Sequence, residues 1–159
     1  MRMGVRCALI LALAASACAK PPAPAPVRAP TMVSAGFDAT WNAVIDIFAE
    51  KNIPIRTIDK DSGIIATDRL AVPEQFSLEY ADCGTDGFMI PQLPTSVIYN
   101  ILVRENGDAT TVRVTASWSS DKSYRCNTRG IWEGDLEANV KDRAERGRPG
   151  ANDPTPTRS

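Results

Sequence analysis

The side chains best suited to chemistry in this sequence are its four cysteines, because a thiol can be acylated, oxidised to a disulfide or used as a nucleophile. The sequence has no histidine, so the usual proton shuttle near neutral pH is absent. It also lacks a glycine-rich phosphate loop after a strand and a Gly-x-Ser-x-Gly setting for a serine nucleophile. We therefore expect a protein that is not an enzyme and that has no metal or cofactor.

The amino-terminal end has the pattern of a secretory signal. A basic start precedes an apolar stretch over residues 7–15 that is too short to cross a bilayer as a helix. Ala15-Ser-Ala-Cys18 closes the stretch and resembles the bacterial lipobox, although that pattern usually has Leu, Val or Ile where this chain has Ala15. The resemblance implies a signal peptide over 1–17 and acyl chains, palmitate among them, on Cys18. The alternative is an ordinary signal peptide with no lipid.

The residue after the candidate lipidated cysteine bears on location. In lipoproteins of two-membrane bacteria, aspartate at this position tends to retain the protein at the inner membrane, and this chain has Ala19. The resemblance therefore implies an outer-membrane anchor with the domain facing the periplasm. The formal net charge of −1 becomes more negative once Arg2 and Arg6 are removed, so we expect no nucleic-acid partner.

Two cysteines remain in the mature domain. Cys7 leaves with the signal and Cys18 carries the lipid, so Cys83 and Cys126 form a lone pair. In an oxidising compartment such a pair most often forms a disulfide. The alternatives are two buried thiols or a metal site, and the sequence has no histidine to complete a metal shell.

The flanks of the domain have distinct compositions. Prolines are so dense after Cys18 that residues 18–33 are expected to form a semi-rigid tether, which in the polyproline conformation would hold the domain roughly 40 Å from the lipid. A proline-rich ligand for a partner domain is the alternative. Residues 147–159 are rich in Gly, Pro and small polar residues, so we expect a disordered tail. A single domain is left over 34–146.

Hydrophobic periodicity predicts the elements of that domain. The Asn106-Gly107 pair between two β-rich runs is the strongest hairpin signal. We expect an α+β fold in the order α-β-β-β-β-β-α, with about five antiparallel strands and both helices on one face. In chain order, the expected elements are a helix over 34–51, strands over 53–58 and 64–67, a strand over 75–80, strands over 96–104 and 110–118, and a helix from Asn127 or Thr128 to about 146.

Several large apolar side chains are candidates for partner or ligand contacts. Trp41 and Trp132 lie one on each predicted helix, where they either anchor the core, the favoured interpretation, or line a groove between helix and sheet. Two prolines keep the apolar loop before the second hairpin out of a central strand, so it is either a flap over the core, again favoured, or an exposed contact surface. Its candidate residues are Phe88, Met89, Ile90 and Leu93.

Two pairs of carboxylates are the remaining candidates for acid-base chemistry. Asp82 and Asp86 flank Cys83, and Glu133 and Glu137 are spaced to share one face of the last predicted helix. Both pairs are more simply interpreted as solvated polar faces than as catalytic groups.

Three motifs lie close together in the first half of the predicted domain: Phe37-Asp-Ala-Thr-Trp41, Ile53-Pro-Ile-Arg56 and Asp59-Lys-Asp-Ser-Gly-Ile-Ile-Ala-Thr67. Together they resemble the repeating unit of BamC-like (NlpB-type) bacterial lipoproteins. In that family the domain is a helix-grip, an antiparallel sheet that grips a long helix, and the protein is an accessory subunit of the machine that inserts β-barrels into the outer membrane. This chain departs from the family in having one such unit and in its Cys83 and Cys126 pair.

These observations and the resemblance lead to two functional hypotheses. The first is a membrane-anchored, non-enzymatic lipoprotein of the cell envelope that acts as a protein-binding accessory or scaffold subunit, through the edge of the sheet or the Phe88–Leu93 loop. The second is a carrier of a small apolar ligand held between the sheet and the long helix. The sequence names neither the partner nor the oligomeric state.

Overall fold

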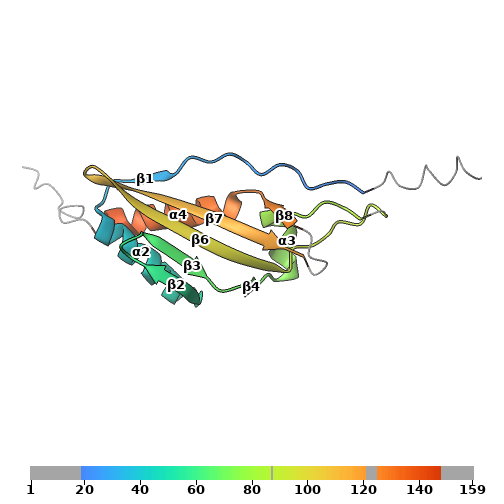
Figure 1. Cartoon of the computed structure of the whole chain (residues 1–159), viewed down its shortest axis with the longest axis horizontal. Helices are drawn as coiled ribbons and strands as arrows, with labels where there is room; N and C mark the ends of the chain where they lie inside the picture. The colour runs from blue at the N-terminus through green and yellow to red at the C-terminus, as the bar shows by residue number, and fades with distance from the viewer. Residues whose placement is uncertain (1–18, 87, 121–124, 148–159) are drawn as a thin grey trace, which may run out of the picture.

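The computed structural model describes residues 19–86, 88–120 and 125–147. The predicted signal peptide, Cys18 and the predicted tail after Gly147 lie outside these residues. The described chain has an α+β fold in which helices cover one face of an antiparallel sheet (Figure 1).

Eight strands of the described residues form the sheet. Its main path runs β2-β3-β6-β7-β8-β5, with β1 beside β7 and β4 beside β6. The strands are β1 (Thr31–Val33), β2 (Ile55–Asp59), β3 (Ile64–Thr67), β4 (Leu70–Ala71), β5 (Ala81–Asp82), β6 (Ser96–Asn106), β7 (Ala109–Ser119) and β8 (Arg125–Thr128), and the helices are α2 (Phe37–Glu50), α3 (Glu74–Tyr80) and α4 (Ile131–Arg146).

Two hairpins form the centre of the sheet. β6 and β7 pair along their whole length around the Gly107-Asp108 turn, where Gly107 has a φ of 64°. β2 and β3 pair around a second turn, in which Gly63 has a φ of 59° and lies so close to the carbonyl oxygen of Val103 that a Cβ would clash. Both predicted hairpins are therefore confirmed, and each turn needs its glycine.

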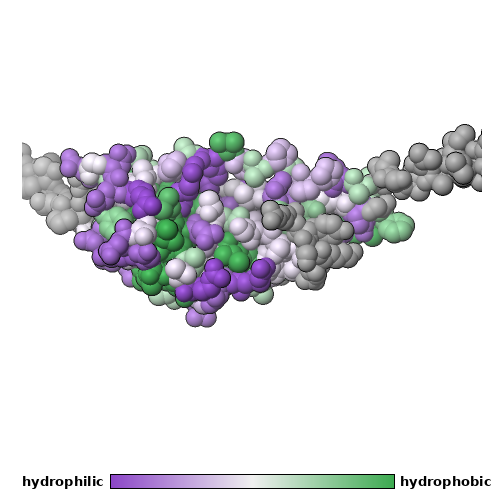
Figure 2. Space-filling view, viewed as in Figure 1, coloured by the Kyte–Doolittle hydropathy of each residue, from purple (hydrophilic) through white to green (hydrophobic). Residues whose placement is uncertain are grey.

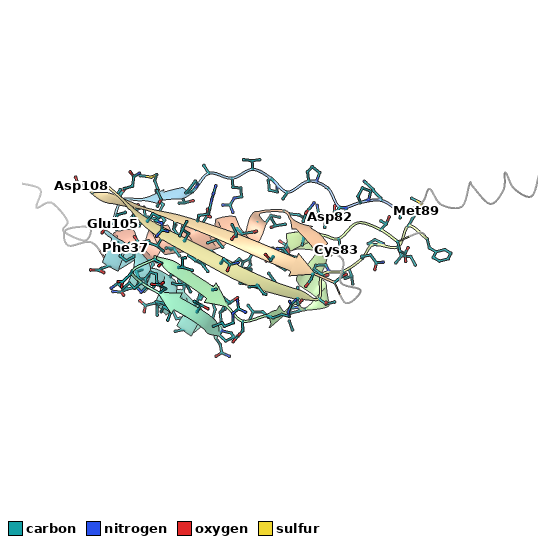
Figure 3. The ribbon with its side chains drawn as sticks, viewed as in Figure 1. Phe37, Asp82, Cys83, Met89, Glu105 and Asp108 are labelled. Atoms are coloured by element: carbon teal, nitrogen blue, oxygen red, sulfur yellow. A yellow bond between two sulfur atoms is a disulfide. The ribbon has the colours of Figure 1, made fainter. Side chains whose placement is uncertain are left out.

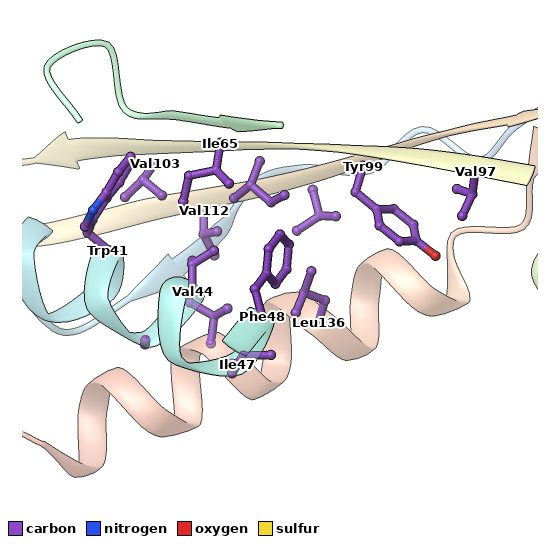
Figure 4. Packing of buried hydrophobic residues seen from close by; sticks show 14 of the residues in the cluster. Trp41, Val44, Ile47, Phe48, Ile65, Val97, Tyr99, Val103, Val112 and Leu136 are labelled. Atoms are coloured by element: carbon purple, nitrogen blue, oxygen red, sulfur yellow. The ribbon is translucent and has the colours of Figure 1, made fainter. Parts of the chain in front are cut away.

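The core lies between the sheet and helices α2 and α4 (Figure 4). Alternate residues of β6 and β7 face the helices, because successive side chains of a strand point to opposite faces. The opposite face of these strands is not covered by a described helix, and Figure 2 shows patches of hydrophobic residues among hydrophilic ones on it. The fully buried side chains include Val33, Val44, Phe48, Ile65, Val103, Val112 and Val140.

Several predicted elements differ from the structure. The strand expected over 75–80 is helix α3, which begins after Pro73 at the N-cap. Six residues are too few for apolar alternation to separate a strand from a helix, and Leu78, which that alternation would place on a buried strand face, is exposed. Helix α4 begins at Ile131 after Gly130, since the residues expected to start it form β8. The predicted five strands are wrong in number, because β1, β4, β5 and β8 are each two to four residues long and have little periodicity of their own.

Candidate functional site

An apolar groove opens on the covered side of the sheet, beyond the carboxyl end of α2. Its volume is about 260 Å³, and it lies between β4, α3, the ends of β6 and β7, and the first turn of α4. None of the residues that line it carries a charge. The groove is therefore suited to an apolar group. Its wall includes Leu70, Val72, Tyr80, Tyr99, Trp118 and Trp132.

The aromatic residues of the groove hold one another in place. The rings of Tyr99 and Trp132 are stacked with centroids 3.6 Å apart, and those of Tyr80 and Trp118 are stacked at 6.2 Å. Tyr99 also meets Trp118 edge-on. Burial raises the pKa of the Tyr99 phenol, and the nearby Glu133 carboxylate raises it further, so Tyr99 stays neutral across the physiological range. The groove wall is thus a pre-formed, uncharged aromatic surface.

The two tryptophans that the sequence singled out have different surroundings. Trp41 is 4% exposed, belongs to the core cluster and stacks on Phe37. Trp132 is partly buried and lines the groove. The sequence did not point to three other residues that line the groove, Tyr80, Tyr99 and Trp118. The alternation in β7 predicts which face of the sheet Trp118 occupies. No local pattern shows that α2 leaves this end of that face uncovered.

The loop after β5 projects from the domain. Phe88, Met89 and Ile90 are 88%, 70% and 57% exposed, whereas Leu93 is partly buried. Figure 3 shows Met89 at one end of the described part of the molecule. The interpretation of this loop as a flap over the core is therefore wrong, and the loop is an exposed surface.

The proline-rich segment lies against the domain along its length. This docked segment, residues 20–33, is called the strap below. At its start, the backbone N–H groups of Lys20 and Ala23 donate to Thr85 Oγ1 and Asp82 Oδ2. The Asn127 amide donates to the carbonyl oxygen of Ala23. At its end, the strap becomes β1 and pairs with β7. The expectation of a free spacer is wrong for these residues.

The centre of the strap is held by a buried carboxylate. Glu137 of α4 accepts hydrogen bonds from Arg28 Nη2 at 2.7 Å, from Thr31 Oγ1 at 2.8 Å and from the backbone N–H of Val114 at 2.8 Å. Arg113 on β7 donates to the carbonyl oxygen of Arg28. Glu137 therefore joins the strap, the sheet and α4 at a single point.

Neither Glu133 nor Glu137 belongs to a solvated face. Glu133 and Glu137 are 2% and 1% exposed, so that interpretation is wrong. Glu133 Oε1 accepts a hydrogen bond from Thr128 Oγ1, while its Oε2 has no partner among the described residues. The two carboxylates bond to different groups, and both line a cavity of about 330 Å³ between the strap, β7 and α4.

The two aspartates near Cys83 organise backbone. Asp82 accepts the N–H groups of Ala23 and Gly84, and these bonds hold the pKa of its carboxyl below its usual range. Asp86 Oδ1 accepts the N–H groups of Phe88 and Ile90. Each carboxylate therefore shapes a turn of the projecting loop or its base.

The predicted disulfide is confirmed. Cys83, directly after β5, is bonded to Cys126 in β8. Both residues are buried, and the bridge closes a sequence separation of 43 residues. The bond fastens the base of the projecting loop to the sheet.

Comparison with known proteins adds no family to this description. No family model matches the chain, and no curated protein matches its sequence. The described residues contain no helix long and apolar enough to cross a membrane. They also contain no cluster of three or more cysteine or carboxylate side chains placed to bind a metal ion.

Proposed function

We propose that this protein is a lipid-anchored, non-enzymatic lipoprotein of the cell envelope that binds another envelope protein through the aromatic groove. The observation that carries the proposal is an open apolar groove beside an unpaired strand edge. The signal pattern and the lipobox-like sequence before Cys18 support the anchor, which is palmitate-bearing and belongs to the outer membrane in this proposal.

The unpaired edge belongs to β4. Residues Leu70 and Ala71 pair with β6 on one side. On the other side no described strand pairs with them, because β2 pairs only with Ile64–Thr67 of β3. A segment of a partner chain can therefore extend the sheet here by backbone hydrogen bonds. Ala71 and Val72 also line the groove, so the same segment can place a side chain in it.

The size of the groove favours a side chain over a larger ligand. Pockets for small molecules usually have volumes of about 300 to 1,000 Å³. The groove, at about 260 Å³, is below that range. Because its walls are aromatic and uncharged, we propose that the occupant is an apolar side chain of the partner, a common anchor in protein interfaces.

The BamC-like resemblance supports a role beside the machinery of outer-membrane assembly. The family's helix-grip places a long helix against an antiparallel sheet, and α4 packs against β7 and β1 in this chain. The resemblance implies a helix-grip fold and an accessory role in such a complex, and we include both in the proposal.

Site-specific photo-crosslinking in intact cells tests the proposal. A photoreactive residue at Ala71, which is exposed beside the groove, is expected to trap a discrete envelope protein. The matched control is the same residue at Asp108, which is exposed at the far end of the β6–β7 hairpin (Figure 3). In the Ala71 background, Trp132→Ala should weaken the crosslink by removing half of the stacked pair. A pattern at Ala71 that matches the pattern at Asp108 would count against the proposal.

The apolar lining also favours a second candidate function, a carrier of a small apolar ligand. Native mass spectrometry of the full chain separates the two candidates. A bound small molecule that is lost in Trp132→Ala supports the carrier, whereas an unliganded mass together with the Ala71 crosslink supports protein binding.

A further inference from the structure

The projecting loop is built to hold three apolar side chains in solvent. Thr85 pairs with Pro91 at its base, and the backbone N–H of Gln92 donates to the carbonyl oxygen of Gly84. The Asp86 carboxylate accepts two backbone N–H groups from the tip, and the Asp86 N–H donates to the carbonyl oxygen of Ile90. The tip, defined as Phe88, Met89 and Ile90, is therefore held outward by its own backbone bonds.

The start of the strap lies against the base of this loop. Lys20 and Thr85 are joined by two hydrogen bonds: the Lys20 N–H donates to Thr85 Oγ1 at 3.1 Å, and the Thr85 N–H donates to the Lys20 carbonyl oxygen at 2.9 Å. Gly84 approaches the Lys20 carbonyl so closely that a Cβ would clash with it. Figure 1 shows the start of the described chain and the loop at the same end of the molecule.

This contact fixes where the proposed anchor leaves the domain. Cys18 is two residues before Lys20 in the sequence, and two extended residues span at most about 7 Å. An acylated cysteine lies at the level of the lipid headgroups, because its chains are buried in the bilayer. The base of the loop must therefore lie close to the membrane surface.

We propose that the tip inserts into the membrane interface beside the acylated cysteine, so that the domain stands on this end. The inference rests on the proposed lipid anchor. The three side chains are the kind that the headgroup and acyl boundary accommodates, and an exposed apolar patch of this kind marks an interaction site. We favour a lipid surface over a protein partner because the strap holds the anchor point against the base of the loop.

The opposite end of the domain points away from the membrane in this arrangement. β6 has 11 residues. At about 3.3 Å per residue it is roughly 36 Å long. Asp108, at the far end of the β6–β7 hairpin, is therefore well outside the lipid and serves as the control position (Figure 3).

The test places an environment-sensitive fluorophore at each end of the full, acylated chain. Met89→Cys and Asp108→Cys are each labelled with a nitrobenzoxadiazole group, with the Cys83–Cys126 disulfide intact. The proteins are incorporated through their lipid into phosphatidylethanolamine–phosphatidylglycerol vesicles that contain spin-labelled lipid. We expect a blue-shifted emission and strong quenching by the spin label at position 89, and neither at position 108.

Two outcomes overturn the proposal, and they are distinguishable. Mass spectrometry of the purified protein first shows whether Cys18 is acylated, and a mature chain without fatty acid overturns both the anchor and the inference. If the chain is acylated but the two labels give equal emission and quenching, the anchor stands and the tip is not in the membrane. In that case the remaining candidate role of the tip is contact with another protein.

Discussion

Removal of the Glu137 carboxylate is the sharpest test of how the strap is held. In Glu137→Ala, the backbone N–H of Val114 is buried without its acceptor, which costs about 1 to 3 kcal/mol. The Arg28 side chain, which is 29% exposed, also loses its partner. Because Arg28 can be partly solvated, we assign that loss about 1 kcal/mol. The expected total is about 3 kcal/mol.

Thermal unfolding and limited proteolysis measure this loss. For a domain of this size, about 3 kcal/mol corresponds to a decrease in Tm of roughly 10 °C. Trypsin cleaves after arginine, so cleavage after Arg28 should become faster in Glu137→Ala as the strap detaches. Glu137→Gln retains an oxygen that can accept the Val114 N–H, and we expect it to lose less stability than the alanine variant.

The control is a residue of the same helix that touches no part of the strap. Asp142 forms an exposed pair with Arg146 on α4, and Asp142→Ala should change the free energy of unfolding by less than about 0.5 kcal/mol. If Glu137→Ala melts within 2 °C of the parent protein and trypsin cleaves it after Arg28 no faster, the buried carboxylate does not hold the strap and our reasoning is wrong.

Three further predictions follow from the same structure. Replacing Cys83 and Cys126 by serine opens a loop of 43 residues and should cost about 4 kcal/mol by the chain-entropy model, measured by urea unfolding; an unchanged midpoint would contradict it. The pKa of Asp82 is lowered from its ordinary 3.8, so its contribution to strap docking should be complete above about pH 5 and be lost progressively as the pH falls through 3.8 and below; amide exchange at the start of the strap should show this loss, and Asp82→Asn should abolish the pH dependence. Arg143→Ala removes a solvent-exposed pair with Glu50 and should leave the midpoint of the same urea assay nearly unchanged, so a clear decrease in the midpoint would be unexpected.

The parts of the fold that sequence predicts are those with long, regular patterns. The 11-residue strands β6 and β7 are rich in β-forming residues, β7 alternates over most of its length, and the Asn106-Gly107 pair stands between them, so their pairing is encoded locally. Helix α2 has a continuous apolar stripe and was predicted to within three residues at its start. The disulfide follows from counting, because Cys83 and Cys126 are the two cysteines left after the predicted signal peptide and the proposed lipid site at Cys18.

The parts that sequence does not predict depend on distant partners. Glu137 looks like a surface residue on a charged helix, and its burial becomes clear only with Arg28, 109 residues away. The groove has the same origin, since Tyr99 and Trp118 form its wall only because α2 ends before it covers them. No residue within either local segment carries this information.

A proline-rich segment can be a free spacer or a docked strap, and the groups that the domain presents to it distinguish the two. Proline supplies no N–H for strand pairing, so such a segment cannot cover the edge of a sheet by a regular ladder. β7 is paired with β1 at one end and with β8 at the other, which leaves the N–H of Val114 between them without a strand partner. Glu137 accepts that N–H and also binds Arg28 of the strap.

The start of α4 leaves space for the Arg28 side chain, because two of its residues are glycines. A Cβ on Gly130 would lie 3.0 Å from Arg28 Cδ, and one on Gly134 would lie 3.3 Å from Arg28 Nη2. Because proline restricts the unfolded chain, docking such a segment costs less conformational entropy than docking a flexible one, and a few well-placed bonds are enough to hold it. A proline-rich composition therefore suits a docked strap as well as a free tether. In this protein, the buried Glu137 on the facing helix favours the docked strap.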